Sequence, residues 1–249
     1  GSDQVWRDSY GRVESYFCDF AGESDKKIFS YAASFGLDSW QFDRERTEVL
    51  RSLIRRFKAV SVREKDAVEL CRDNLNIEAN WVLDPTLLLS KEDYISLFKD
   101  VCKEKSEGNL MTYILDYTEE KQGLIDVVEK QKGLKSFSVM AKENEEFPAI
   151  EKWLRGFYDA KFVLTDSFHG MVFSIIFEKP FFVVLNKQRG SSRFLSLLSA
   201  LGLEDRLIEN IDSFNINLLD KEIDYERLRK RLFALVDRSK EFLINCLEK

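Results

Sequence analysis

Residues 161–190 read KFVLTDSFHGMVFSIIFEKPFFVVLNKQRG, and this stretch decides how the rest of the chain is interpreted. An apolar run from Phe162 to Leu164 is followed by a small polar turn and then by apolar residues at helical spacing, and Pro180 opens a second apolar run. This order is typical of a strand, a tight turn, a helix and a second strand. In a doubly wound sheet such a turn lies at the carboxyl edge of the strands, where ligands bind.

The polar turn places Asp166 and Ser167 beside His169, which is the only histidine in the chain. Backbone N–H groups at a helix N-terminus, together with the positive end of the helix dipole, form a ready site for an anion. Arg189 and Arg193 follow the second strand, so we expect them near the same edge. The stretch therefore predicts an anionic substrate held beside one titratable imidazole.

Length and composition restrict the class of protein. The chain has 249 residues, of which 44% are hydrophobic and 33% charged, and this describes one or two soluble globular domains. A net charge of −6 argues against a nucleic-acid-binding surface. The four cysteines are far apart in the sequence, which suggests neither a zinc site nor a disulfide scaffold. With no signal peptide and no apolar run near the roughly 20 residues of a membrane span, we expect a cytoplasmic protein without a membrane-spanning segment.

Strand-like and helix-like segments alternate twice along the chain, which is typical of parallel α/β domains. Strand-like runs at 27–33, 58–62 and 80–83 enclose amphipathic segments, and a second alternation starts at residue 110. We therefore predict an α/β protein with two Rossmann-like domains facing a cleft. The predicted ranges are 1–90 for the first domain, 91–222 for the second, and 223–249 for an amphipathic helix that packs across or back on the first domain.

Six motifs follow one another in the sequence: GSDQVW at 1–6, YAASFG at 31–36, SVRE at 61–64, LDPT at 83–86, TDSFHG at 165–170 with FSIIFEKPF after it, and RGSSRF at 189–194. In order and spacing this set resembles the polysaccharide pyruvyl transferase family, from residue 1 to about Leu207. The resemblance implies a GT-B-like fold. It also implies transfer of an enolpyruvyl group from phosphoenolpyruvate to a sugar, with closure of a pyruvate ketal on two hydroxyls. The family pattern has an earlier portion ahead of GSDQVW, so we expect the first domain to lack its N-terminal part.

The chemistry of this donor suggests a role for the polar turn. Phosphoenolpyruvate carries a phosphate and a carboxylate, so its site needs several cationic or N–H donors in a partly dry cleft. Its methylene carbon is protonated as the acceptor hydroxyl attacks, and a histidine suits such proton traffic because its pKa lies near neutrality. We expect His169 to act as the general acid or as a phosphate ligand, and Ser167 with the N–H groups around Gly170 to contact the phosphate.

Cationic side chains from both predicted domains are candidates for the carboxylate and the phosphate. We expect Arg63, together with Arg189 or Arg193, to clamp these two groups, and Lys187 is a further candidate in the same loop. The alternative for Arg63 is a surface ion pair with an acidic neighbour such as Glu64.

Asp3 and Asp166 are the carboxylates expected to orient the acceptor sugar or the imidazole, and which of them deprotonates the hydroxyl stays open. The sequence has no G-x-G-x-x-G fingerprint and no P-loop, which disfavours dinucleotide and nucleoside triphosphate enzymes. With no Asp-x-Asp pair and no histidine cluster, we expect no metal site and no cofactor besides the donor substrate.

Three functions are in view. The first is a pyruvyl transferase that acts on a cell-surface polysaccharide or its lipid-linked precursor from the cytoplasmic side, including the inner face of the membrane. The second is a GT-B glycosyltransferase that uses a nucleotide-sugar. The third is an inactive or truncated relative that serves as a binding module.

Overall fold

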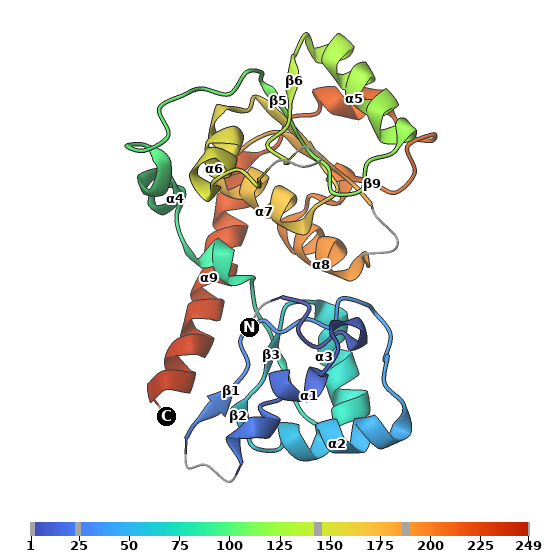
Figure 1. Ribbon diagram of the computed structural model, residues 1–249, viewed down its shortest axis with the longest axis vertical. Helices are drawn as coiled ribbons and strands as arrows, with labels where there is room; N and C mark the ends of the chain where they lie inside the picture. The colour runs from blue at the N-terminus through green and yellow to red at the C-terminus, as the bar shows by residue number, and fades with distance from the viewer. Residues whose placement is uncertain (1–2, 23–25, 142–145, 186–189, 249) are drawn as a thin grey trace. The chain divides into compact units, whose positions relative to one another are not determined.

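Strands and helices alternate along the chain in the computed structural model, which describes residues 3–22, 26–141, 146–185 and 190–248 (Figure 1). The chain divides into two compact units. Unit 1 comprises Gly1–Leu88, Lys187–Gly202 and Arg229–Lys249, and unit 2 comprises Leu89–Asn186 and Leu203–Leu228.

Unit 2 is built on a parallel sheet of five strands in the order β6-β5-β7-β8-β9. The strands are β5 (Leu110–Tyr113), β6 (Ser136–Phe137), β7 (Phe162–Thr165), β8 (Phe181–Val184) and β9 (Leu207–Ile208). Both β7 and β8 are buried along their whole length and consist mainly of β-branched and aromatic residues. Parallel strands covered on both faces have this composition. The parallel α/β architecture that the sequence predicts is thus present in unit 2.

Capping residues determine where several helices of unit 2 begin and end. They are α4 (Lys91–Phe98), α5 (Glu119–Lys132), α6 (Ile150–Asp159) and α7 (Phe168–Ile176), with 3-10 turns η6 (Glu204–Arg206) and η7 (Ile216–Asp220). The hydroxyl of Ser90 accepts from the N–H of Asp93 in a capping box, and the hydroxyl of Thr118 caps α5. Gly133 ends α5 in the left-handed region, at φ 61°.

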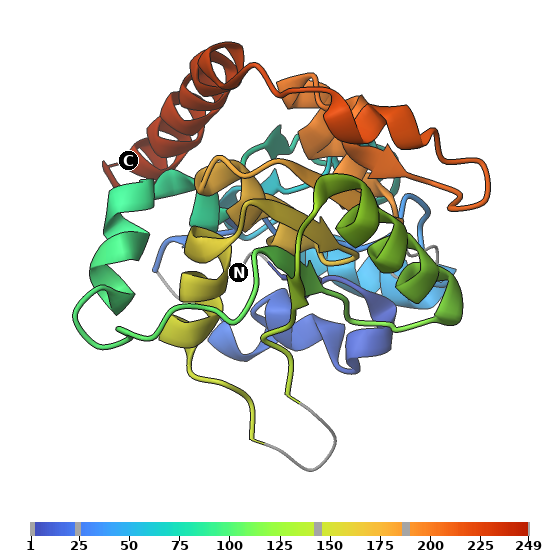
Figure 2. The ribbon, with the colours of Figure 1, turned by 90° about the horizontal axis from the view of Figure 1, so that it is seen from above.

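Helices cover both faces of this sheet, as the view from above lets the reader follow (Figure 2). On one face Leu124, Ile125 and Val128 of α5 pack against the strands. On the other face Gly156 of α6 lies so close to Met111 of β5 that an added Cβ would be 3.2 Å from the methionine Cε. Polar chemistry in unit 2 is therefore concentrated at the ends of the strands.

Unit 1 contains short parallel strands. They are β1 (Ile28–Phe29), β2 (Phe57–Ala59), β3 (Ser61–Val62) and β4 (Asn80–Trp81). β1 pairs with β2 and β3 pairs with β4, while a bridge joins Ala33 to Val62. Residues 57–62 therefore lie between the 28–33 segment on one side and β4 on the other. The first strand is shorter than the predicted 27–33 because Ala32 has a φ of 52°, which interrupts extended pairing.

The remaining elements of unit 1 surround these strands. They are η1 (Asp8–Tyr10), α1 (Val13–Tyr16), η2 (Asp19–Ala21), α2 (Arg44–Ile54), α3 (Lys65–Leu70), the π-helical turn η3 (Cys71–Leu75), η4 (Pro85–Leu88), α8 (Ser192–Leu201), and most of α9 (Tyr225–Glu248). The N–H of Lys65 in α3 donates to Ser196 of α8 over 3.0 Å. The hydroxyl of Ser239 in α9 accepts from the N–H of Leu83 over 3.0 Å. These bonds fasten two helices from late in the sequence to unit 1.

The compact units differ from the predicted domain ranges at residues 187–202, which the sequence placed in the second domain and which belong to unit 1. The physical reason is a close backbone approach at Gly190, where φ is 81° and an added Cβ would lie 2.1 Å from the carbonyl oxygen of Gly36. Only glycine fits such a contact, and the contact directs α8 onto unit 1. Residues 223–249 were predicted to form a helix that packs across or back on the first domain, and residues 229–249 do belong to unit 1 with residues 1–88.

No helix in the described ranges has both the length and the apolar character needed to cross a bilayer.

Candidate active site

The strand order of unit 2 reverses direction between β5 and β7. Counted along the sequence, the sheet reads second, first, third, fourth, fifth, so successive strands are added on opposite sides of β5. Ligands of open α/β sheets bind outside the carboxyl ends of the strands at such a switch point. Here the two turns that meet at that point are Ile114–Asp116 after β5 and Asp166–Gly170 after β7.

The turn after β7 is the capped start of α7. The hydroxyl of Ser167 accepts from the N–H of Gly170 over 3.3 Å, and the hydroxyl of Thr165 accepts from the N–H of Ser167 over 3.0 Å. Thr165 in turn donates to the carbonyl of Tyr113 at the end of β5 over 2.6 Å. An added Cβ at Gly170 would lie 2.2 Å from the Thr165 hydroxyl oxygen, so glycine is required for this packing. The sequence TDSFHG thus produces one specific helix start at the switch point.

His169 lies in the first turn of α7 and is partly exposed. Its imidazole packs edge-on against the ring of Phe168, with ring centroids 5.5 Å apart. In the first turn of a helix the backbone N–H groups have no intrahelical acceptor. His169 therefore presents a titratable ring at the part of the helix that favours an anion.

Asp166 is fully buried and holds the two switch-point turns together. Its carboxylate accepts from the N–H of Leu115 over 2.6 Å and from the N–H of Asp116 over 3.1 Å. The Nζ of Lys121, on α5, lies 2.7 Å from the same carboxylate and also donates to the carbonyl of Asp116 over 2.6 Å. Orienting the imidazole or the sugar stays a prediction for Asp166. The contacts themselves give it a positioning role, fixing the β5 turn beside the β7 turn.

A second set of charged side chains lies at the carboxyl ends of the unit 1 strands. Arg63 follows β3 and is 4% exposed, and its Nη1 lies 2.7 Å from the carboxylate of Asp84, which follows β4. Its Nε lies 3.7 Å from Glu64, and the hydroxyl of Ser34 donates to the same glutamate. The alternative for Arg63 is therefore correct in its partner, Glu64, and wrong in its location, because the pair is buried.

Arg193 belongs to the same unit and is 7% exposed. The pKa of Arg193 is lowered to about 10, chiefly by burial and next by the positive charge of Arg63, while the carboxylates of Glu64 and Asp3 act in the opposite direction. The two arginines and Glu64 thus act electrostatically on one another within unit 1. Asp3 is exposed, and its carboxylate accepts from the N–H of Gln4 over 2.7 Å.

Four further contacts bring the motifs of unit 1 to one place. The N–H of Trp6 donates to the carbonyl of Ser34 over 3.1 Å, and the N–H of Arg63 donates to the carbonyl of Ala33 over 3.1 Å. An added Cβ at Gly36 would lie 2.3 Å from the Gln4 side-chain oxygen, and Gly190 is in close contact with Gly36 as described above. The five motifs GSDQVW, YAASFG, SVRE, LDPT and RGSSRF therefore assemble one edge of unit 1.

Replacing Glu64 by Gln should change how stability depends on pH. Burial holds the pKa of Glu64 above its ordinary value of 4.5, although Arg63 and Ser34 act to lower it. Because the folded protein holds this proton more tightly than the unfolded chain, the stability it contributes is fully present below pH 4.5 and is lost as the pH rises through the folded pKa. Glu64→Gln should therefore show a smaller fall in unfolding free energy as the pH rises above 4.5.

Urea denaturation at a series of pH values measures this difference. Glu120→Gln, at an exposed position on α5, is the matched control and should follow the wild-type curve. Equal slopes for Glu64→Gln and wild type would contradict the assignment of a raised pKa to Glu64.

Two of the predicted site residues, Lys187 and Arg189, lie outside the described residues. Among the residues that the structure describes, no three side chains of histidine, cysteine, aspartate or glutamate come together as a metal site would require. Of the other predicted residues, Asp166, Ser167, His169 and Gly170 come together in unit 2, and Asp3, Arg63 and Arg193 lie in unit 1.

A family model described as polysaccharide pyruvyl transferase matches residues 1–188. The chain belongs to this family. The match covers the first five motifs, and with them both the switch-point turn of unit 2 and most of the charged edge of unit 1. A comparison with curated proteins found no match to the chain. As a member of the pyruvyl transferase family the chain is assigned to the transferases, with a saccharide as its implied acceptor.

Some residues of these sites were not among the sequence predictions. Lys121 appears in the sequence as one lysine among several on an amphipathic helix, and nothing local indicates that its side chain is buried. Asp84 stands before Pro85 in a context typical of a turn, and it accepts from the N–H of Thr86 over 3.0 Å. Asp84 and Arg63 each follow directly after a strand-like run, and this shared position is the sequence signal that could have predicted their ion pair.

Proposed function

We propose that this chain moves the enolpyruvyl group of phosphoenolpyruvate onto two hydroxyls of a cell-surface saccharide, free or lipid-linked, and closes a pyruvate ketal. The proposal includes the two-domain GT-B architecture of the family resemblance, with unit 2 as the donor-binding part, and a cytoplasmic location. One observation carries it: in a chain of the pyruvyl transferase family, the single histidine stands in the first turn of a capped helix at the switch point of a parallel sheet.

The donor phosphate is assigned to the start of α7. The hydroxyl of Ser167 and the backbone N–H groups near Gly170 supply hydrogen-bond donors, and the helix dipole favours negative charge there. The turn is held by Thr165 and by the Asp166–Lys121 ion pair. Such a preorganised set of donors needs little rearrangement when charge develops on the leaving phosphate.

The carboxylate and phosphate of the donor are further assigned to cations of unit 1. Arg63 and Arg193 are the described candidates, with Lys187 and Arg189 as the others. Two buried guanidinium groups near each other support this assignment, because the positive charge of Arg63 lowers the pKa of Arg193 and an anion favours such a pair. The ion pair of Arg63 with Asp84 fixes the direction of its guanidinium, which favours a defined geometry for a carboxylate ligand.

The reaction can be followed bond by bond. The first acceptor hydroxyl forms a C–O bond at C2 of phosphoenolpyruvate while a proton is added to the methylene carbon, which becomes a methyl group. The C2–O bond to phosphate then breaks, and the second hydroxyl forms a second C–O bond at C2. Of the two hydroxyl protons, one balances the proton on the methyl group and the other leaves with inorganic phosphate. His169 is assigned the delivery of the proton or a contact to the phosphate.

The two candidate bases differ in burial, and this difference supports a separate role for each. Asp166 is fully buried and accepts three hydrogen bonds, so its geometry suits positioning. Asp3 is exposed and can reach a substrate from solvent. We therefore assign deprotonation of the acceptor hydroxyl to Asp3.

The experiment that tests this function measures donor and product together. The protein is incubated with phosphoenolpyruvate and candidate saccharides, and inorganic phosphate release is followed alongside the methyl signal of a pyruvate ketal in proton NMR. We expect both signals to appear in equal amounts with a suitable acceptor. Calorimetric binding of UDP- or GDP-sugars without binding of phosphoenolpyruvate would instead support a nucleotide-sugar glycosyltransferase. Donor and acceptor binding with no product would support a binding module.

A further inference from the structure

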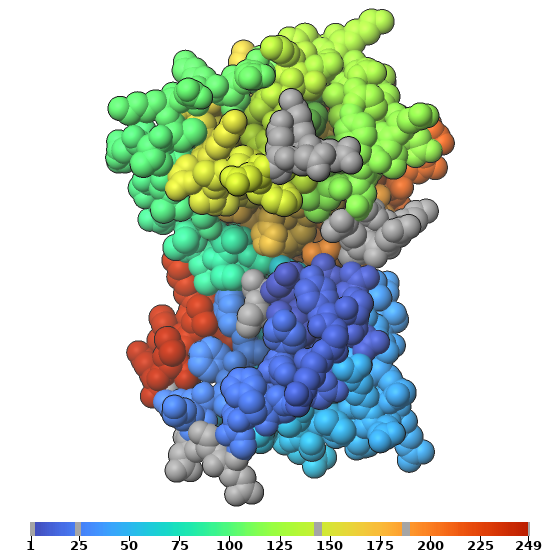
Figure 3. Space-filling model, in the orientation of Figure 1, coloured from blue at the N-terminus to red at the C-terminus, as the bar shows by residue number. Residues whose placement is uncertain are grey.

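A groove of about 640 Å³ lies between α6 and β6 in unit 2. Its walls come from the 104–107 loop, the 136–141 segment, and Lys152 and Arg155 on the first turns of α6. This volume lies in the range of small-molecule sites. The loop after α4 and the start of α6 are exposed on one face of unit 2 in the space-filling view (Figure 3). None of the residues of the Asp166–Gly170 turn lines the groove, so it is a separate feature.

The charges that line the groove are balanced. Three are carboxylates and three are cations: Glu104, Glu107, Glu146, Lys105, Lys152 and Arg155. The cation that is least exposed to solvent, Arg155, already contacts Asp159 over 2.9 Å and donates to the carbonyl of Cys102 over 3.0 Å. An anion would therefore meet as many carboxylates as cations. A neutral ligand with many hydroxyl groups fits this lining better, since both charge types and the hydroxyls of Ser106 and Ser138 can bond to it.

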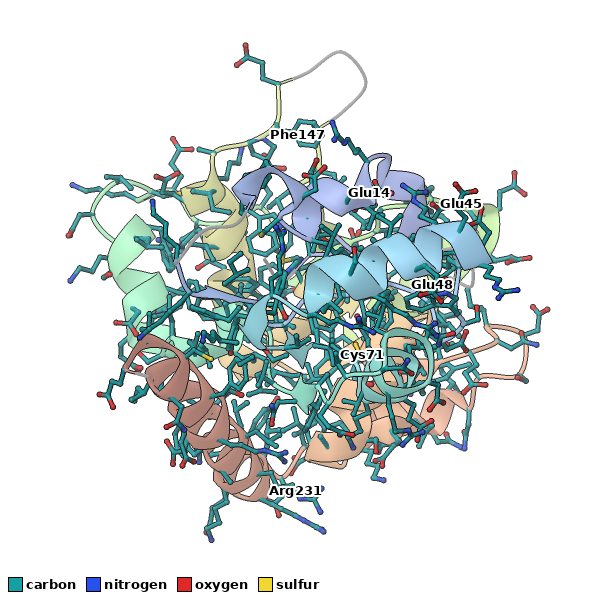
Figure 4. All side chains as sticks on the ribbon, turned by 90° about the horizontal axis from the view of Figure 1, so that it is seen from below. Glu14, Glu45, Glu48, Cys71, Phe147 and Arg231 are labelled. Atoms are coloured by element: carbon teal, nitrogen blue, oxygen red, sulfur yellow. The ribbon has the colours of Figure 1, made fainter. Side chains whose placement is uncertain are left out.

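An apolar strip borders the groove where the chain enters α6. Pro148 lines the groove, and its neighbour Phe147 is 80% exposed, while Ile150 is 58% exposed. Figure 4 shows Phe147 on the loop before α6, at the periphery of the molecule. A sugar ring carries hydroxyls around its rim and C–H groups on its faces, so it matches a polar groove with an aromatic ring beside it. Ligand sites generally combine apolar surface with a few placed polar groups in this way.

Pairing of an extended peptide to β6 is disfavoured, although β6 is an edge strand of the sheet. The strand has only two residues, Ser136 and Phe137, and the N–H of Ser136 already donates to the carboxylate of Glu129. Strand addition requires a row of available backbone groups.

One end of the groove lies at the edge of the sheet that carries the switch point, while the 104–107 loop precedes β5 at the opposite edge. β6 pairs with β5, and β5 pairs with β7, so two inter-strand spacings, about 10 Å, separate β6 from the strand that carries the Ser167–Gly170 turn. Segment 138–141 leaves β6 at the same carboxyl edge as that turn. An oligosaccharide could therefore occupy the groove with one part and the switch point with another.

We infer that this groove is a saccharide subsite, which binds neutral sugar units of the acceptor chain that are remote from the two reacting hydroxyls. The inference rests on the proposed function for the identity of the acceptor. In this assignment the groove recognises the length of the acceptor chain, and the donor binds at the start of α7.

The test uses binding, with the full chain and without turnover. Probes are neutral and anionic oligosaccharides of graded length on a glycan array, followed by calorimetry with the best neutral ligand. The variants Phe147→Ala and Glu107→Ala change exposed residues, so the fold should persist. Phe233→Ala on α9, where the ring is 60% exposed, and Glu120→Ala on α5 are the matched controls.

For wild type we expect affinity to rise with length. Each groove variant should lose about tenfold in affinity, or about 1.4 kcal/mol, while the controls and phosphoenolpyruvate binding stay unchanged. Equal oligosaccharide affinity in wild type and both groove variants would overturn the subsite, as would preferential binding of inorganic phosphate or of an extended peptide in the groove. If the wild-type chain bound no phosphoenolpyruvate but the groove variants still lost glycan binding, the proposed function would be contradicted and the subsite would be supported. If the groove variants formed the ketal fully and kept wild-type oligosaccharide affinity, the proposed function would be supported and the subsite would be contradicted.

Discussion

His169→Ala should lower the rate of ketal formation by about 10²–10⁴-fold, the usual contribution of a positioned general acid. The structure gives the physical reason, since this is the chain's only imidazole and it stands in the first turn of α7 at the switch point. Stability should change little, because the ring is partly exposed and its packing against Phe168 is worth about 0.5–1.5 kcal/mol. Steady-state kinetics and thermal melting of the same preparation separate the two effects.

The form of the kinetic defect distinguishes the two roles assigned to His169. Loss of proton delivery lowers kcat, whereas loss of a phosphate contact alone raises KM for phosphoenolpyruvate at nearly constant kcat. Lys130→Ala, at an exposed position on α5, is the control and should retain wild-type kinetics. Full turnover by His169→Ala would remove the histidine from the mechanism.

Asp166→Ala should lower the unfolding free energy by about 3–5 kcal/mol, the usual cost of breaking a buried ion pair from one side. The substitution leaves the ammonium of Lys121, with an 8% exposed side chain, without its carboxylate. It also removes the acceptor for the N–H groups of Leu115 and Asp116. Chemical denaturation measures the loss, and phosphoenolpyruvate binding should weaken in parallel because the two switch-point turns are no longer joined.

Two companion variants show whether burial is the cause. Adding Lys121→Met to Asp166→Ala removes the uncompensated charge and should recover part of the stability. Asp220→Ala breaks an ion pair of the same length, 2.7 Å to Lys132, at the surface and should change stability little. Comparable losses from Asp166→Ala and Asp220→Ala would contradict the role given to the buried pair.

Much of unit 2 could be predicted from local pattern. Apolar runs such as Phe162–Thr165 and Phe181–Val184 identify buried parallel strands because their side chains are covered on both faces. A glycine directly after an amphipathic run indicates a helix end, and Gly202 ends α8 with a left-handed φ of 72°. The turn at Ser167–Gly170 was also placed correctly at a helix start, because a small polar residue before an apolar helix is a local signal.

Contacts between residues far apart in the sequence could not be predicted in the same way. Lys121 and Asp166 are 45 positions apart, and neither has a neighbour in sequence that indicates the other. Arg193 was assigned to the second domain because its motif follows β8, but the backbone contact at Gly190 directs α8 onto unit 1. In both cases tertiary packing determined the result, and a single sequence does not display it.

The central claim is that the start of α7 binds the phosphate of phosphoenolpyruvate, and a crystal structure with the donor bound tests it most directly. We predict phosphate oxygens within hydrogen-bond distance of the Ser167 hydroxyl and of N–H groups up to Gly170. The imidazole of His169 should lie within about 2.6–3.2 Å of a phosphate oxygen, or next to the methylene carbon that receives the proton. Phosphoenolpyruvate bound with no contact to residues 167–170 would contradict the account.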